Sequence, residues 1–181
     1  AFLLLLLAAG CGSLYKVKPV VEAPLPAEAP ADEDAILTLR AVPLVADEES
    51  QELFEANMPL AGLLPVRLEM VNKGSAPVEM ERARFRLRDA EGGMWKFRTA
   101  KDAASRILSN NKITLYNPNA RAKFEEALRA YAFDTKRPLA PGERRQGLIF
   151  FQTPKKEAVT NPRGLVLVIE RLPQPLAIRL N

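Results

Sequence analysis

The chain contains no histidine and a single cysteine, Cys11. Without histidine, a Ser-His-Asp or Cys-His catalytic arrangement and a His-ligated zinc or copper site are excluded. A single cysteine permits neither an intramolecular disulfide nor a thiolate cluster. A His-independent enzyme would need carboxylates, lysine or serine gathered in one pocket. Glu125 and Glu126 are a poor acid/base pair, because adjacent residues on a predicted helix point to different faces. We therefore expect a protein that is not an enzyme and has no metal site.

Charge of one sign is not concentrated anywhere along the chain. The 26 basic and 22 acidic residues give a net charge of +4, and they are interspersed. A nucleic-acid partner would favour a concentrated basic face, so we expect none. The 181 residues, 48% of them hydrophobic, suit one domain with short appendages. Fifteen prolines spread along the chain favour short strands and loops over a helical bundle.

Long hydrophobic runs are also scarce, and the longest one stands at the N-terminus. Residues Phe2 to Ala9 are uninterruptedly apolar. A membrane-spanning helix needs about 20 apolar residues, whereas the core of a secretion signal needs about 7–15. Three small residues, Ala8, Ala9 and Gly10, then lead directly into Cys11. The run is therefore interpreted as part of a signal peptide rather than as a membrane helix.

The motif "LAAGC", formed by Leu7, Ala8, Ala9, Gly10 and Cys11, resembles the lipobox of bacterial lipoproteins. In that family the cysteine thiol receives a diacylglyceryl group, a signal peptidase cuts just before the cysteine, and the new amino group is often acylated. The resemblance implies that Leu7 to Gly10 are recognised by the peptidase. It also implies that Cys11 carries the lipid, with no other cofactor. The alternative is a buried structural cysteine.

Two departures accompany this resemblance. Alanine stands at position 8, where leucine is the commonest residue of the lipobox. No initiator methionine or basic segment precedes the apolar run, so residues 1–10 are expected to be only part of a signal peptide. Gly12, rather than an aspartate, follows the cysteine. In the lipoprotein family this implies an outer-membrane anchor facing the periplasm. Residues 11–35, rich in proline, alanine and acidic residues, are expected to form an extended, solvated tether.

Residues 36–181 alternate apolar and polar residues between turn signals, which predicts one mainly β domain. Val78 and Phe85 are an odd number of residues apart, so in one regular strand their side chains would point to opposite faces. We therefore expect a strand over 78–87 with a β-bulge near Glu81–Arg82, which would bring both side chains to the same face. Thr99 with Asp102 predicts the start of a helix, and Asn117-Pro118 predicts another. The fold class that follows is an antiparallel two-sheet sandwich of about seven strands, with a helical insertion over about residues 99–133. "LLPVRLEMVNKGSAPVEM" and "PLAPGERRQGLIFF" resemble the immunoglobulin-like domains of uncharacterised bacterial lipoproteins.

Two surfaces are candidate partner sites. The first is a row of four guanidinium groups expected on one strand face, which suits carboxylate or phosphate groups: Arg82, Arg84, Arg86 and Arg88. The alternative is a solvated face paired with acidic residues of neighbouring strands, namely Glu69, Glu79 or Glu81. The second candidate is Tyr116, in the polar loop "NNKITLYNPN". The alternative here is that the helical insertion only caps the open end of the sandwich. Met94, Trp95 and Phe97 are expected in the core.

The function that the sequence favours is a lipid-anchored cell-envelope protein acting as a non-catalytic binding or assembly module. Its expected partners are the membrane, through the lipid, and an envelope protein. The first alternative is an accessory lipoprotein subunit of a secretion or envelope machine, and the second is a His-independent envelope enzyme. The sequence leaves the oligomeric state open.

Overall fold

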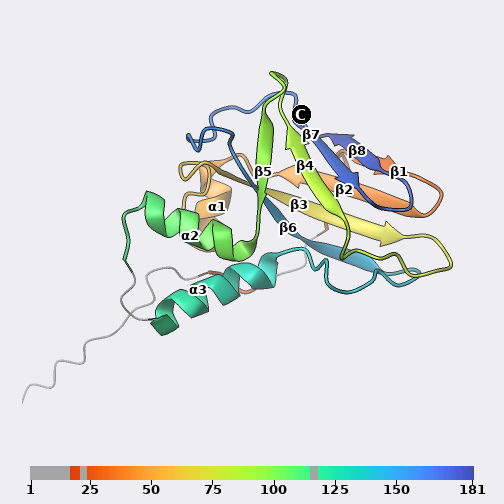
Figure 1. The fold of residues 1–181 in the computed structure, drawn as a ribbon, viewed down its shortest axis with the longest axis horizontal. Coiled ribbons are helices and arrows are strands. Elements are labelled where there is room, and N and C mark those ends of the chain that lie inside the picture. Colours follow the sequence, from red (N-terminus) through yellow and green to blue (C-terminus); the bar gives the residue numbers. More distant parts are fainter. Residues whose placement is uncertain (1–16, 21–23, 115–117) are drawn as a thin grey trace, which may run out of the picture.

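The computed structural model describes residues 17–20, 24–114 and 118–181 (Figure 1). Cys11, Leu7 to Gly10 and Tyr116 lie outside the described residues. The described chain forms eight strands and three helices: β1 (Ala31–Glu33), β2 (Leu37–Pro43), α1 (Asp47–Phe54), β3 (Leu63–Asn72), β4 (Arg84–Arg88), β5 (Met94–Arg98), α2 (Ala100–Asn110), α3 (Pro118–Tyr131), β6 (Arg144–Gln152), β7 (Val166–Glu170) and β8 (Leu176–Arg179).

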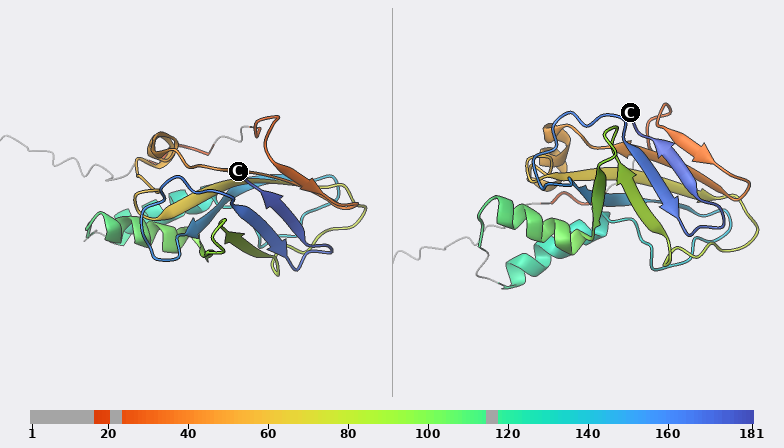
Figure 2. Two further views of the ribbon diagram at one scale, coloured as in Figure 1. Left: turned by 90° about the horizontal axis from the view of Figure 1, so that it is seen from above. Right: turned by 45° about the horizontal axis from the view of Figure 1, so that its top comes forward.

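All eight strands belong to one antiparallel sheet with the order β1-β2-β3-β6-β5-β4-β7-β8. The two end strands, β1 and β8, are in contact. The backbone N–H of Ala177 in β8 donates a hydrogen bond to the carboxylate of Asp32 in β1 at 2.8 Å. The sheet is therefore a nearly closed barrel (Figures 1 and 2). The mainly β prediction is confirmed, but a sandwich of two separate sheets is not observed. The reason is β5, which pairs with β6 over Lys96–Arg98 and with β4 over Met94–Trp95, and so joins the two walls.

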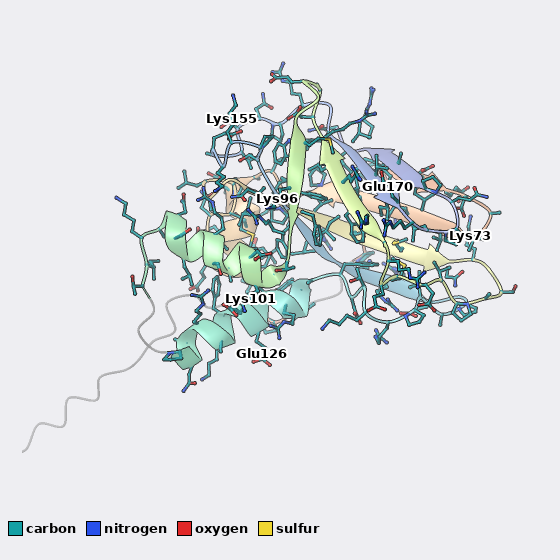
Figure 3. All side chains as sticks on the ribbon, viewed as in Figure 1. Lys73, Lys96, Lys101, Glu126, Lys155 and Glu170 are labelled. Carbon is teal, nitrogen blue, oxygen red and sulfur yellow. The ribbon has the colours of Figure 1, made fainter. Side chains whose placement is uncertain are left out.

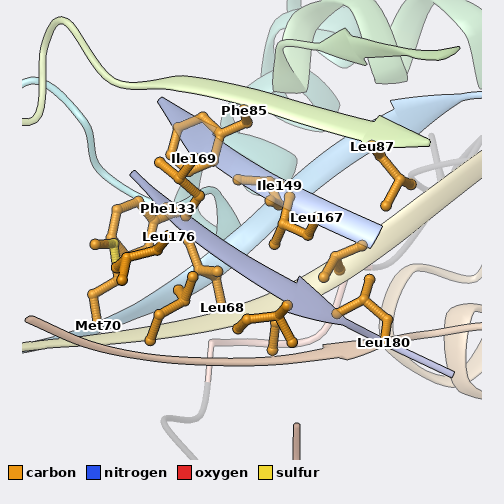
Figure 4. Packing of buried hydrophobic residues seen from close by; sticks show 14 of the residues in the cluster. Leu68, Met70, Phe85, Leu87, Phe133, Ile149, Leu167, Ile169, Leu176 and Leu180 are labelled. Atoms are coloured by element: carbon orange, nitrogen blue, oxygen red, sulfur yellow. The ribbon is translucent and has the colours of Figure 1, made fainter. Parts of the chain in front are cut away.

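The barrel interior is filled by side chains that alternate along the strands. Leu64, Val66, Leu68 and Met70 of β3 all point inward. They meet residues from the opposite wall, among them Leu167 and Ile169 of β7 (Figure 4). The inward positions are separated by two residues, as the period of a strand requires. This interior is the main hydrophobic core.

A second core lies outside the barrel, between the helices and the outer face of β3 and β6. Leu148 and Phe150 of β6 point outward into it, while Ile149 and Phe151 point into the barrel. The helices contribute much of this core, including Phe54 of α1, Ala103, Ala104 and Ile107 of α2, and Phe124, Leu128 and Tyr131 of α3. The alternative in which the insertion only caps an open end of a sandwich is therefore not what is observed. The helices cover one wall of the barrel (Figure 2), because β6 is apolar on both faces.

The starts of the two longer helices agree with the sequence signals. The Thr99 side chain accepts a hydrogen bond from the backbone N–H of Asp102 at 3.1 Å, and the Asp102 carboxylate accepts one from the Thr99 N–H. This capping box opens α2 as predicted. Helix α3 begins at Pro118, where a missing N–H costs nothing because the first turn has no intrahelical partner for it.

The predicted strand over 78–87 is wrong in its first half. Val78 makes only an isolated bridge to Leu139, and the chain then turns, with the N–H of Ala83 donating to the carbonyl of Met80 at 3.0 Å. Strand β4 begins at Arg84. The opposite parity of Val78 and Phe85 is thus resolved by a turn at Glu81–Arg82 and not by a bulge within one strand.

The segment expected to be a solvated tether packs on the domain wherever it is described. Leu25 and Ala29 are buried, and residues 31–33 form β1. The backbone N–H of Lys18 donates to the carbonyl of Leu53 in α1 at 3.0 Å. Residues 17–20 and 24–35 therefore differ from the extended, solvated spacer that was expected.

Candidate functional site

Strand β4 presents three arginine side chains to solvent. Arg84, Arg86 and Arg88 are exposed, whereas Phe85 and Leu87, the residues between them, are buried in the barrel. The helices lie against the other wall of the barrel, so the outer face of β4 and β7 is open (Figures 1 and 2). Part of the predicted arginine row is therefore present as a strand face.

Arg82 does not belong to this face. It lies in the turn that precedes β4, because the chain does not become a strand until Arg84. Glu69, one of the predicted cross-strand partners, lies on β3 and pairs with Arg40 and Arg144 at 3.5 and 2.6 Å. The predicted pairing of Glu69 with the arginine row is therefore wrong.

The sheet register adds two cations that the sequence analysis missed. Arg88 lies opposite Met94 of β5 and Val166 of β7, and Val166 lies opposite Arg179 of β8. Directly opposed residues share a face, so cations and apolar side chains alternate across four strands. Lys96 follows Met94 by two residues and lies on the same face. We call this surface the basic face: Arg84, Arg86, Arg88, Lys96 and Arg179.

One acid lies within the basic face. Glu170 of β7 accepts from Nε of Arg86 at 3.0 Å, and the two side chains are 39% and 50% exposed. Figure 3 labels Lys96 and Glu170, on the two sides of β4. An exposed pair of this kind contributes about 0–1 kcal/mol. Arg84, Arg88, Lys96 and Arg179 make no ion pair with any residue that the structure describes, so the face carries uncompensated positive charge.

The β4–β5 hairpin is held by one carboxylate. Asp89 accepts from the indole N–H of Trp95 at 2.9 Å and from the backbone N–H groups of Gly93 and Glu91 at 2.7 and 3.1 Å. The hydrogen bond from Trp95 is the largest influence on the pKa of Asp89; together with the backbone donors it outweighs burial and lowers that pKa. The ionised carboxylate thus fixes the turn between Arg88 and Met94.

The aromatic and apolar residues of β5 divide between core and surface. Trp95 is buried, as predicted. Met94 and Phe97 are 51% and 41% exposed, so their assignment to the core is wrong. Met94 takes part in the basic face, and Phe97 stacks on Phe85 with ring centroids 5.7 Å apart. Phe97 is exposed because β5 leaves β4 at this point to pair with β6.

The described ranges lack both a metal-binding cluster and a membrane-spanning helix. Residues 17–20, 24–114 and 118–181 hold no group of three or more Asp, Glu, His or Cys side chains placed to bind a metal ion. Nor do these ranges contain a helix with the length and hydrophobicity needed to span a bilayer.

Comparison of the chain with protein-family models, with curated proteins and with solved structures gave no match. The basic face is therefore interpreted from its own residues. Its arginine forks are suited to planar carboxylates, and its intervening Val166, Val168 and Met94 are suited to apolar contacts.

Proposed function

We propose that the protein is a lipid-anchored bacterial cell-envelope protein whose β domain is a non-catalytic binding or assembly module. The observation that carries the anchor is the "LAAGC" motif, in which the chain's single cysteine directly follows an apolar run and small residues. Two or three acyl chains would anchor the protein durably, since each buried methylene contributes about 0.8 kcal/mol. Gly12 supports an outer-membrane location facing the periplasm.

The packing of the N-terminal segment bears on how such an anchor would hold the domain. Lys18 is bound to α1 and α3, and six residue steps separate Cys11 from Val17. At no more than about 3.6 Å per step, six steps span at most about 22 Å. The proposed anchor therefore keeps the helix-covered wall near the membrane. The basic face, on the opposite wall, is then turned toward the periplasm.

The basic face supports a binding role for the module. Its five cations outnumber the single acid, Glu170, and an acidic protein surface would neutralise them. We propose an acidic envelope protein as the partner. We also propose that the domain is related to the immunoglobulin-like domains of bacterial lipoproteins. Its two walls, β1-β2-β3-β6 and β4-β7-β8, support this relationship.

The anchor is tested by metabolic labelling with radioactive palmitate in a bacterial host, using the chain with its complete signal peptide. The wild type is expected to incorporate label and to shorten on processing. Cys11→Ser is expected to remain unlabelled and unprocessed, and Ser13→Ala serves as a control that keeps the cysteine. Label retained on the Cys11→Ser variant would contradict the proposal. Mild crosslinking of the labelled protein then identifies the acidic partner.

A further inference from the structure

A groove with a volume of about 810 Å³ opens at the end of β5. It lies between the start of α2, the end of α3 with the segment 132–136, and the middle of β6. Ligand sites in proteins commonly have volumes of about 300–1,000 Å³. Phe97 and Arg98, at the end of β5, also line the groove.

The floor of the groove is apolar. It is formed by Leu148, Ile149 and Phe150 of β6 together with Phe133, all of them at most 5% exposed. Gly147 allows the backbone of Phe133 to lie directly on β6, with the Phe133 N–H donating to the Leu148 carbonyl at 2.9 Å. Phe97 stands at the mouth of the groove. An alkyl chain or an aromatic ring placed here would replace water against apolar surface.

The rim of the groove is cationic. Arg98, Lys101, Arg129 and Lys136 line it, against one acid, Asp134. Asp134 is already paired with Arg137 at 2.8 Å, and Arg98 donates through Nε to Gln152 at 2.9 Å. Lys101, Arg129 and Lys136 make no ion pair with another described residue. Three cations thus remain to meet a negative charge.

The first turn of α2 adds to this positive potential. Ala100 and Lys101 line the groove at the N-terminus of the helix, where backbone N–H groups lack intrahelical acceptors. The Thr99 hydroxyl and the Asp102 carboxylate are occupied by each other and by the capping box. Because these two side chains bind each other, the charged donors that remain for a ligand in the groove are Lys101, Arg129 and Lys136.

We propose that this groove binds an anionic amphiphile with a single alkyl chain. The carboxylate or phosphate headgroup lies among Lys101, Arg129 and Lys136, and the chain lies on Phe97 and Phe133. The complementary charge selects an anion, and the apolar floor selects one with a hydrocarbon tail. This site is separate from the lipid proposed on Cys11 and does not depend on it.

Isothermal titration calorimetry tests the proposal on the full chain carrying Cys11→Ser, purified without lipid. Four C12 probes are titrated below their micellar concentrations: dodecanoate, dodecyl phosphate, dodecyltrimethylammonium and dodecyl maltoside. We expect dodecanoate or dodecyl phosphate to bind at least tenfold more tightly than the cationic and neutral probes, and the tighter of the two identifies the headgroup. Acetate and inorganic phosphate should bind at least tenfold more weakly than their C12 counterparts. Equal affinity for all four C12 probes would overturn the proposal.

Charge reversals locate the site. Lys101→Glu and Lys136→Glu are each expected to weaken dodecanoate binding at least tenfold, whereas Lys155→Glu, on a loop of another part of the molecule (Figure 3), should leave it unchanged. An acidic residue in the first turn of α2 is favourable to the helix, so Lys101→Glu is expected to fold. Unchanged affinity in both groove variants, or equal loss in the Lys155→Glu control, would show that the amphiphile binds elsewhere.

Discussion

The phenolic O–H of Tyr131, near the end of α3, donates to the backbone carbonyl of Lys18 at 2.8 Å. Residues 113 positions apart in the sequence are thereby joined, and the Tyr131 ring also contacts Phe54 of α1 edge-on at 5.1 Å. Burial raises the pKa of Tyr131, and the nearby charge of Lys18 only partly opposes this, so the hydroxyl keeps its proton and donates at neutral pH. The segment of residues 17–20 is therefore part of the folded structure.

Tyr131→Phe should loosen that segment without disturbing the second core. It removes the hydrogen bond and keeps the ring, so the free energy of unfolding should fall by about 1 kcal/mol. Exchange of the Lys18 amide hydrogen, which is bonded to the Leu53 carbonyl, should accelerate. Tyr131→Leu, which also loses the ring contact with Phe54, should cost more. An unchanged exchange rate in Tyr131→Phe would mean that the hydroxyl does not hold the segment.

Glu69 should make the stability of the domain depend on pH. Its side chain is only 6% exposed, and burial, the largest single influence, raises its pKa. The hydrogen bonds from Gln146 and Arg144 and the charges of Arg144 and Arg40 together outweigh burial, so the pKa lies below the usual 4.5. The stabilisation is then complete well above pH 4.5 and is lost as the pH falls through the lowered pKa.

Glu69→Gln should accordingly lower the free energy of unfolding by about 1–3 kcal/mol at pH 7. The difference between wild type and variant should shrink as the pH falls below 4.5, because protonation removes the charge in the wild type too. Urea unfolding at a series of pH values measures this, with the exposed Glu28→Gln as the control. A difference that stays constant down to about pH 2 would contradict the assignment.

Gly147→Ala should destabilise the domain strongly. A Cβ atom on Gly147 would lie 2.4 Å from the Cα and 2.5 Å from the N of Phe133, and backbone atoms of this kind cannot rotate away. We expect a loss of about 3 kcal/mol, at the upper end of what overpacking costs. Gly92→Asn is the control, since its Cβ meets nothing within 4 Å and asparagine tolerates positive φ. Thermal unfolding followed by circular dichroism compares them; equal melting temperatures would be inconsistent with the close backbone contact.

Reversing two charges of the basic face should weaken binding to acidic polymers without affecting folding. Arg84→Glu combined with Arg88→Glu removes cations that make no ion pair with a described residue, so stability should stay within about 0.5 kcal/mol of the wild type. Binding to immobilised poly-L-glutamate should weaken at least tenfold and become less sensitive to salt. The doubly reversed control, Lys123→Glu with Lys155→Glu, should bind nearly as the wild type does. Equal loss in both would show that net charge, rather than this face, decides binding.

Thr99→Ala should weaken the start of α2. It removes the side-chain acceptor of the Asp102 N–H, and the loss of such a cap costs about 1 kcal/mol. Thr99→Ser keeps the hydroxyl and should restore most of the stability. Chemical denaturation of both variants provides the measurement. An alanine variant as stable as the serine variant would argue that the capping box contributes nothing.

The features predicted correctly from the sequence are those with a local signal. The capping box at Thr99 and the proline at the start of α3 involve residues within one turn of each other. Each of these depends on backbone geometry that neighbouring residues determine.

The features missed depend on pairing between distant segments. Arg179 joins the basic face only because β8 pairs with β7 and β7 with β4, a register that no local pattern contains. Lys96 belongs to the same face because side chains alternate along β5. The sequence "MWKFR" contains this alternation, so it could have placed Lys96 on the same face as Met94. The packing of Leu25 and the closure of the sheet into a barrel likewise depend on tertiary contacts. Cys11 and Tyr116 stay predictions.

The meeting of β1 and β8 has a consequence for aggregation. An open sheet edge exposes unpaired N–H and C=O groups that can recruit a strand from another molecule. Here one edge ends in a three-residue strand containing Asp32 and Glu33, and Asp32 accepts the N–H of Ala177 from the other edge. Short, acidic edge strands resist such recruitment. Proteolytic loss of residues 24–35 would uncover β2 and β8 together, so a clipped form should be far more prone to form β-aggregates than the intact domain.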